Sequence, residues 1–246
     1  MPENLPRLTK NRLIKYACEA LGLGIFMFSA GLFDILIDHP DFRIRSLIES
    51  SIIRRFLIGL SMGLTALFII FSPFGQKSKA HINPSVTLIF WRLRRIKGFD
   101  AIFYVVFQFI GGALGMILIS LLLPQSIKHP VINYIVTIPS SLGKMVAFFA
   151  EFLISFMLMS TVLWTNKHPK LSKFTPYFTA TLITLFITFE APFSGMSMNP
   201  ARTFASAIVS NVWTGFWIYC TAPIFGMFLA GEIYRFKDSL LAFLQS

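Results

Sequence analysis

The stretch Met196-Ser197-Met198-Asn199-Pro200-Ala201-Arg202 is the most informative part of this sequence, and His81-Ile82-Asn83-Pro84-Ser85 repeats its central pattern. Asn is a favoured helix N-cap, and Pro at the first helical position loses no hydrogen bond, because that N–H has no partner inside a helix. The two stretches therefore predict helices over about 83–92 and 199–210. At 1.5 Å per residue each helix measures roughly 15–18 Å, about half of a bilayer's hydrocarbon core. Irregular backbone at membrane depth is tolerated only inside protein or beside a watery cavity, so two such half-helices indicate a pore.

The composition is that of a membrane protein. The chain has 246 residues, of which 55% are hydrophobic and 13% charged, and its mean hydropathy is +0.68. These values are typical of polytopic membrane proteins and exclude an ordinary soluble domain. Apolar runs of spanning length predict six transmembrane helices, at about 13–37, 54–72, 99–123, 142–164, 175–191 and 213–235.

Two further features of the composition bear on the class of protein. A basic N-terminal segment leads into the first apolar run without a small-residue cleavage pattern, so we interpret that run as a span and not as a signal peptide. Cys18 and Cys220 both lie in apolar runs, where we expect packing residues and no disulfide framework.

The formal net charge of +11 is compatible with nucleic-acid binding, but the distribution of the positive residues argues against it. Most Lys and Arg fall in segments that alternate between the predicted spans: Arg7, Lys10, Arg12, Lys15, Lys77, Lys79, Arg92, Arg94, Arg95, Lys97, Lys167, Lys170, Lys173, Arg235 and Lys237. By the positive-inside rule this pattern predicts a multi-pass protein of the cell membrane (plasma or inner membrane) with both termini cytoplasmic. We therefore expect a lipid bilayer around the chain and no nucleic-acid partner.

The chain also repeats itself. In each half a span with an embedded glutamate (Glu19 or Glu151) is followed by a second span, an Asn-Pro half-helix and a third span. Three spans are an odd number, so the second half is inverted and the half-helices meet N-terminus to N-terminus near the midplane. The predicted fold is all-α and integral to the membrane: six transmembrane helices plus two re-entrant half-helices in an inverted repeat. We expect one channel domain over 1–246, with repeats at about 13–123 and 142–235.

Together these features resemble the aquaporin, or major intrinsic protein, family. The resemblance covers about 13–235 and rests on both Asn-Pro boxes and on these residues: Val86-Thr87, Arg202, Ala17-Cys18-Glu19, Ala150-Glu151, Gly63-Leu64-Thr65, Gln108, Gly111-Gly112, Pro223 and Gly226. It implies an aquaporin-like fold, a homotetramer with one pore per subunit, and a passive channel for water or small neutral solutes. It implies no cofactor, no metal and no enzymatic activity.

The two boxes, Asn83-Pro84-Ser85 and Asn199-Pro200-Ala201, are the predicted centre of the pore. Each helix N-terminus carries about half a positive charge, and two of them at the midplane repel cations, hydronium included. We expect the amides of Asn83 and Asn199 to donate hydrogen bonds to a passing solute oxygen. The alternative is that each Asn only caps its helix.

Arg202 follows the second box at membrane depth, where a charge is costly unless it faces water or is paired. The resemblance assigns it to a selectivity constriction, and counting back from the boxes places Met62, Ile187 and Met196 there with it. The alternative is a structural ion pair with a carboxylate such as Glu190.

This chain departs from the family pattern at several of these positions. Ser85 stands where Ala is usual, position 187 carries no His, and Thr203 follows Arg202 where glycerol-conducting members have Asp. The predicted rim is apolar and, because methionine is flexible, of adaptable width. Whether it selects water or a solute such as glycerol, hydrogen peroxide or ammonia stays open.

Three further polar residues have predicted roles. Glu19 and Glu151 lie at corresponding places in the two halves, so we expect them to accept backbone N–H groups of the re-entrant loops and not to bind a transported ion. His81 precedes the first box, and we expect it to line the cytoplasmic half of the pore; the alternative is packing.

Three rival functions were weighed against a passive channel. A coupled secondary transporter requires titratable groups at the midplane, and apart from the two glutamates the spans offer none. An intramembrane enzyme requires a catalytic or metal motif, but His39, His81, His129 and His168 are isolated from one another. A closed or purely structural pore is the third alternative.

Overall fold

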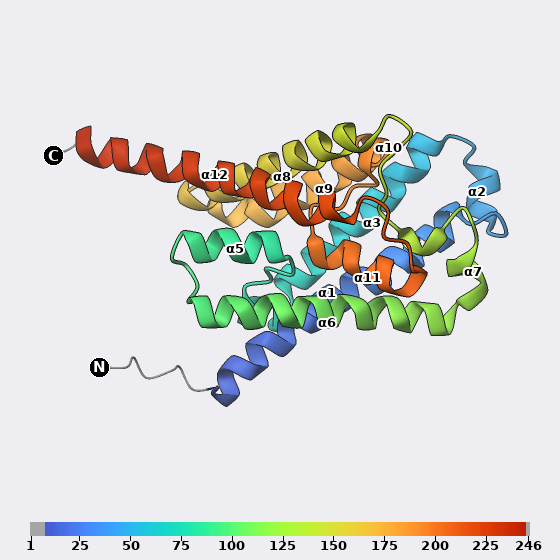
Figure 1. Cartoon of the computed structure of the whole chain (residues 1–246), viewed down its shortest axis with the longest axis horizontal. Helices are drawn as coiled ribbons and strands as arrows, with labels where there is room; N and C mark the ends of the chain where they lie inside the picture. The colour runs from blue at the N-terminus through green and yellow to red at the C-terminus, as the bar shows by residue number, and fades with distance from the viewer. Residues whose placement is uncertain (1–7, 245–246) are drawn as a thin grey trace.

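The structure, a computed structural model, describes residues 8–244, with side chains up to residue 237. Arg7 of the basic N-terminal segment lies outside the described residues. The described residues form helices joined by loops, and no strands. The six predicted spans correspond to the long helices α1 (Lys10–Asp38), α3 (Ser51–Phe71), α6 (Gly98–Leu122), α8 (Lys144–Lys167), α9 (Thr175–Phe189) and α12 (Phe216–Leu244) (Figure 1).

The two half-helices begin where the Asn-Pro boxes predict. They are α5 (Pro84–Arg92) and α11 (Pro200–Ser210), with Asn83 and Asn199 as their N-caps. Short helices and 3-10 turns connect the long elements: α2 (Arg43–Leu47), α4 (Pro73–Ser78), α7 (Pro124–Lys128), η1 (Asn133–Ile135), η2 (Ser172–Phe174) and α10 (Ala191–Ser194).

The fifth span is shorter than predicted. Among the described helices, five are long and apolar enough to cross a membrane, whereas α9 has 15 residues and ends at Phe189 instead of residue 191. Pro192 lacks the N–H that would bond the Thr188 carbonyl, so the helix breaks and α10 begins at Ala191. The freed Thr188 carbonyl accepts a hydrogen bond from Arg55 Nε on α3 over 3.1 Å.

The helices pack as the inverted repeat requires. Within the halves α1 packs on α6 and α8 on α12, while α3 and α9 pack together across the halves. The half-helices also cross over, because α11 packs on α6 of the first half and α5 on α12 of the second. Close packing needs small residues: a Cβ at Gly111 or Gly226 would overlap the backbone carbonyl of Ala20 or Phe152.

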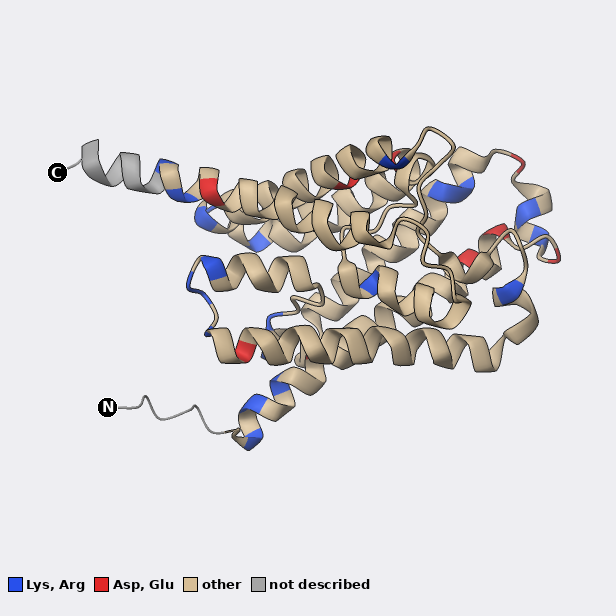
Figure 2. Cartoon of the chain, in the orientation of Figure 1, with Lys and Arg blue, Asp and Glu red and all other residues tan. Residues whose placement is uncertain are grey.

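The two ends of the bundle differ. The start of α1 and the described end of α12 lie at one end, and α2 and α7 lie at the other, which we call the far end (Figure 1). Charged residues gather mostly at these two ends, and the middle of the bundle is nearly free of them (Figure 2). An apolar middle between two charged ends is the pattern of a protein that crosses a bilayer.

Candidate pore

The asparagines of the two boxes link the half-helices. Asn83 Oδ1 accepts from the backbone N–H of Ser85 over 2.8 Å, and Asn199 Oδ1 accepts from that of Ala201 over 3.1 Å. These bonds cap the two half-helices, and the side-chain amide nitrogens make a second pair of hydrogen bonds. Asn83 Nδ2 donates to the Met198 carbonyl, and Asn199 Nδ2 donates to that of Ile82, each over 2.8 Å. A side-chain amide has two N–H donors, so capping and donation to a solute do not exclude each other.

Buried carboxylates hold the loops that lead into the boxes. Glu19 accepts the backbone N–H of His81 over 3.0 Å and that of Ile82 over 2.6 Å. In the second half, Glu151 accepts those of Ser197 and Met198, both over 2.7 Å. Each glutamate is fully buried.

Side chains of the protein also donate hydrogen bonds to these carboxylates. Gln108 Nε2 donates to Glu19 over 2.7 Å, and Ser194 Oγ donates to Glu151 over 2.7 Å. Neither glutamate lines the cavity described below. These contacts agree with the prediction that both glutamates support the loops, and that prediction stays open to test.

The loops adopt an uncommon backbone conformation that the carboxylates stabilise. Ile82 has φ +39° and Met198 has φ +55°, each directly before its Asn. Positive φ is unusual outside glycine and most unusual for a β-branched residue such as Ile82. The left-handed turn directs two successive N–H groups of each loop toward one carboxylate, and those bonds offset its strain.

A single cavity of about 850 Å³ runs along both halves of the repeat. Every residue predicted for the constriction lines it, and so do the predicted pore-lining residues: Met62, Ile187, Met196, Arg202, His81, Asn83 and Asn199. The box residues Pro84, Ser85, Pro200 and Ala201 are buried behind its wall.

Arg202 is anchored by the backbone and not by an acid. Its Nη1 donates to the Ile135 carbonyl over 3.0 Å, and within residues 8–237 no carboxylate lies within ion-pair distance of it. Both oxygens of Glu190 are buried and have no hydrogen-bond partner among those residues. The alternative of an Arg202–Glu190 ion pair is therefore wrong, and the guanidinium faces the cavity.

Comparison with known proteins agrees with this geometry. A family model described as major intrinsic protein matches residues 10–234. The chain belongs to the major intrinsic protein family. Channels make up this family, not enzymes, so the hypothesis of an intramembrane enzyme is set aside.

Individual relatives within the major intrinsic protein family are distant. Aquaporin-4 of Bos taurus is 30% identical over 182 residues, which are 73% of this chain and 55% of the relative. The probable aquaporin TIP4-1 of Oryza sativa subsp. japonica is 34% identical over 160 residues, 64% of this chain and 62% of the relative. The matches thus span little more than half the length of these curated relatives. The solved structure of the aquaglyceroporin from Plasmodium falciparum shares the fold, with TM-score 0.76, 18% identity and coverage of 91% and 95% of the two chains.

The position of His81 is compatible with both roles that the sequence left open. It lines the cavity, and its Nδ1 lies 3.1 Å from Thr87 Oγ1. Its ring also packs edge-on against Phe90 and Tyr104, with centroids 4.8 and 5.2 Å away.

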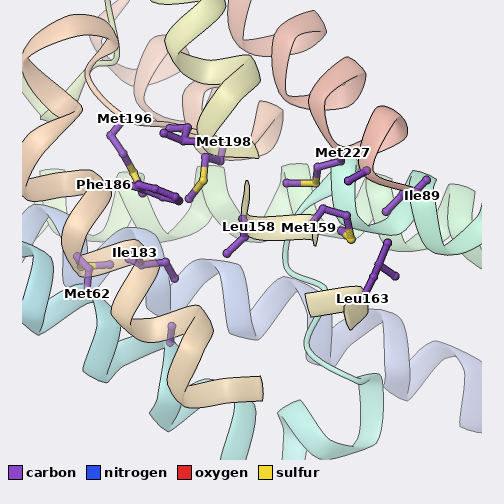
Figure 3. Close-up of a cluster of buried hydrophobic side chains, with 13 residues drawn as sticks. Met62, Ile89, Leu158, Met159, Leu163, Ile183, Phe186, Met196, Met198 and Met227 are labelled. Carbon is purple, nitrogen blue, oxygen red and sulfur yellow. The ribbon is translucent and has the colours of Figure 1, made fainter. Parts of the chain in front are cut away.

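Two of the three apolar residues predicted for the rim are flexible methionines. Met62, Met196 and Met198 belong to one buried cluster with Phe186 and Ile183 (Figure 3). The predicted rim thus continues into the hydrophobic core, and methionine rotamers would set its width.

The sequence analysis missed three charged residues that line the cavity near the far end: Asp34, Asp38 and Arg55. Asp34 and Asp38 continue a stripe with Phe26 and Ala30 along α1 at intervals of four residues. That spacing is the signal that was available, because residues four apart share a helix face. Which face of α1 meets the cavity depends on packing against distant helices.

Proposed function

We propose that this protein is a passive transmembrane channel for water and small uncharged solutes. The observation that carries the proposal is the reciprocal bonding of Asn83 to Met198 and Asn199 to Ile82 inside a cavity lined by both halves. This bonding holds the N-termini of α5 and α11 together while one donor of each amide stays available. A solute oxygen that accepts from both amides directs its own protons outward, which hinders proton hopping along a file of water.

Electrostatics supports exclusion of cations and protons. Each half-helix N-terminus contributes about half a positive charge, and Arg202 adds a full one in the same cavity. A cation that has lost part of its hydration shell is repelled by these charges. Neutral molecules avoid this barrier, so the geometry favours them as permeants.

The solute class depends on the rim of Met62, Ile187 and Met196 beside Arg202. An apolar rim provides few partners for water, so the alternative is a facilitator for glycerol, hydrogen peroxide or ammonia that conducts water poorly. A coupled transporter is less favoured, because Glu19 and Glu151 are engaged by the loops. The names of the relatives, aquaporins and an aquaglyceroporin, support a channel of this general kind.

We also propose that the chain forms one channel domain over 1–246 in a plasma or inner cell membrane, with both termini cytoplasmic. The position of the described ends of α1 and α12 at one end of the bundle supports a common side. The family resemblance supports a homotetramer with one pore per subunit. Mass measurement of the protein in lipid tests the tetramer.

Stopped-flow light scattering on proteoliposomes tests the function. An osmotic gradient of an impermeant sugar reports water flux, and a glycerol gradient reports solute flux. Fast water flux with negligible glycerol flux establishes a water channel, while glycerol flux establishes a solute facilitator. Water and glycerol fluxes no faster than those of empty liposomes would overturn the proposal in favour of a closed pore.

A further inference from the structure

A pore that repels cations by positive charge attracts anions by the same charge. The cavity is lined by the side chains of Arg202 and Arg55, and by Asn83 and Asn199, the N-caps of the two half-helices. The apolar rim adds nothing negative. A negative group in the same space would oppose this attraction.

Two carboxylates of the described residues line the cavity, and they differ in their partners. Asp38 Oδ1 is bound by Arg54 Nε over 2.6 Å and by Arg45 Nη1 over 3.2 Å, so its charge is neutralised locally. Among the described residues, no hydrogen bond or ion pair reaches the carboxylate of Asp34. Asp34 is half-buried and lines the cavity one helical turn inward from Asp38.

Asp34 also lies within electrostatic range of Arg202, yet the two make no ion pair within 4.0 Å. An ion-paired carboxylate and guanidinium cancel each other and close the space between them. Two opposite charges that stay apart both act on whatever passes through the cavity. A solute therefore meets a negative and a positive group in the same part of the pore.

We propose that Asp34 is a specificity-determining residue that excludes anions from this pore. Its carboxylate repels small anions such as chloride and nitrate that Arg202 and the half-helix N-termini attract. Cations that Asp34 attracts are stopped further inward by the half-helix N-termini. The two opposing charges in series leave neutral solutes as the permeant class. This role rests on the channel function proposed above.

The test uses full-length protein in proteoliposomes at mildly alkaline pH, with a halide-sensitive dye inside to report chloride and nitrate uptake. Asp34→Asn keeps the shape of the side chain and removes its charge. We expect its anion permeability to rise at least about tenfold over wild type, while its water flux stays within about twofold. Asp34→Glu, which retains the charge, should exclude anions as wild type does.

The matched control is Asp41→Asn. Asp41 follows Asp38 closely in the chain, its side chain is 87% exposed, and it does not line the cavity. The control removes the same charge close to the C-terminal end of α1 and should leave anion permeability unchanged. An equal rise in both variants would assign the effect to surface potential and overturn the role of Asp34.

Different results overturn the role of Asp34 and the channel function. Wild type that conducts neither water nor glycerol overturns the channel. A water-conducting Asp34→Asn that still excludes anions overturns only the role of Asp34. If Asp34→Asn does not assemble, Asp34→Ser provides the same comparison with a smaller polar group.

Discussion

The side-chain amide of Asn83 donates to the backbone carbonyl of Met198 over 2.8 Å, across 115 positions of the chain. The side-chain amide of Asn199 donates in turn to the backbone carbonyl of Ile82, also over 2.8 Å. Through these bonds the two re-entrant loops form one unit in which neither is held by its own half alone. A substitution that disrupts one box should therefore also destabilise the other.

Replacing Asn83 by Ala removes both the cap of α5 and the donor to the Met198 carbonyl. A lost N-cap costs about 1 kcal/mol, and a buried carbonyl left without its donor costs roughly 1–3 kcal/mol more. We expect a lower midpoint of thermal unfolding in detergent and slower water flux. Asn83→Asp keeps the cap acceptor, so it should recover part of the stability. If the thermal unfolding midpoint of Asn83→Ala equals that of wild type, the hydrogen bonds between the two loops do not stabilise the protein.

Glu151→Gln replaces one acceptor oxygen by an NH2 group that faces the backbone N–H of Ser197 or Met198. Two opposed donors leave at least one buried N–H unsatisfied, at a cost of about 1–3 kcal/mol. We expect a reduced free energy of unfolding, measured by denaturant titration in micelles. The control is Glu49→Gln in an exposed segment, which should change nothing. Equal stability of both variants would show that the carboxylate does not support the loop.

Gly111→Ala places a methyl group where the backbone carbonyl of Ala20 lies. Because backbone atoms cannot move aside cheaply, α1 and α6 must separate, and we expect loss of most folded protein. At the neighbouring Gly112 the nearest atom is a Leu23 side-chain carbon at 3.2 Å, so Gly112→Ala should be milder. Size-exclusion chromatography of the two detergent-solubilised variants gives the comparison. Similar elution of both variants would contradict this account of helix packing.

Two substitutions at the constriction should move selectivity in opposite directions. Arg202→Ala removes the cavity-facing guanidinium and widens the pore, so we expect faster glycerol flux and a measurable cation leak. Ile187→His adds a polar group to the apolar rim and narrows it, which should lower glycerol flux while water flux is kept or raised. Paired water and glycerol measurements on proteoliposomes check both. Unchanged flux ratios in the two variants would place the constriction elsewhere.

Much of the fold could be predicted because its signals are local. The N-caps at Asn83 and Asn199 depend on residues within one helical turn, and span length and charge sign are read along the chain. The corresponding positions of Glu19 and Glu151 in the two halves were also visible in the sequence. The end of α9 was misplaced by two residues, although Pro192 was available as a signal.

The sequence by itself determined the class of this protein: apolar spans, two capped half-helices, an inverted repeat and an arginine beside the second box. The tertiary structure alone decided what faces the pore. Three features depend on helices far apart in the chain: Asn83 reaches the Met198 carbonyl, Arg202 bonds the Ile135 carbonyl and not Glu190, and Asp34 lines the cavity with no ion-pair partner within residues 8–237. Helix formation is governed by neighbours within a turn. The direction in which one helix face points is set by packing between whole segments, which no local pattern encodes.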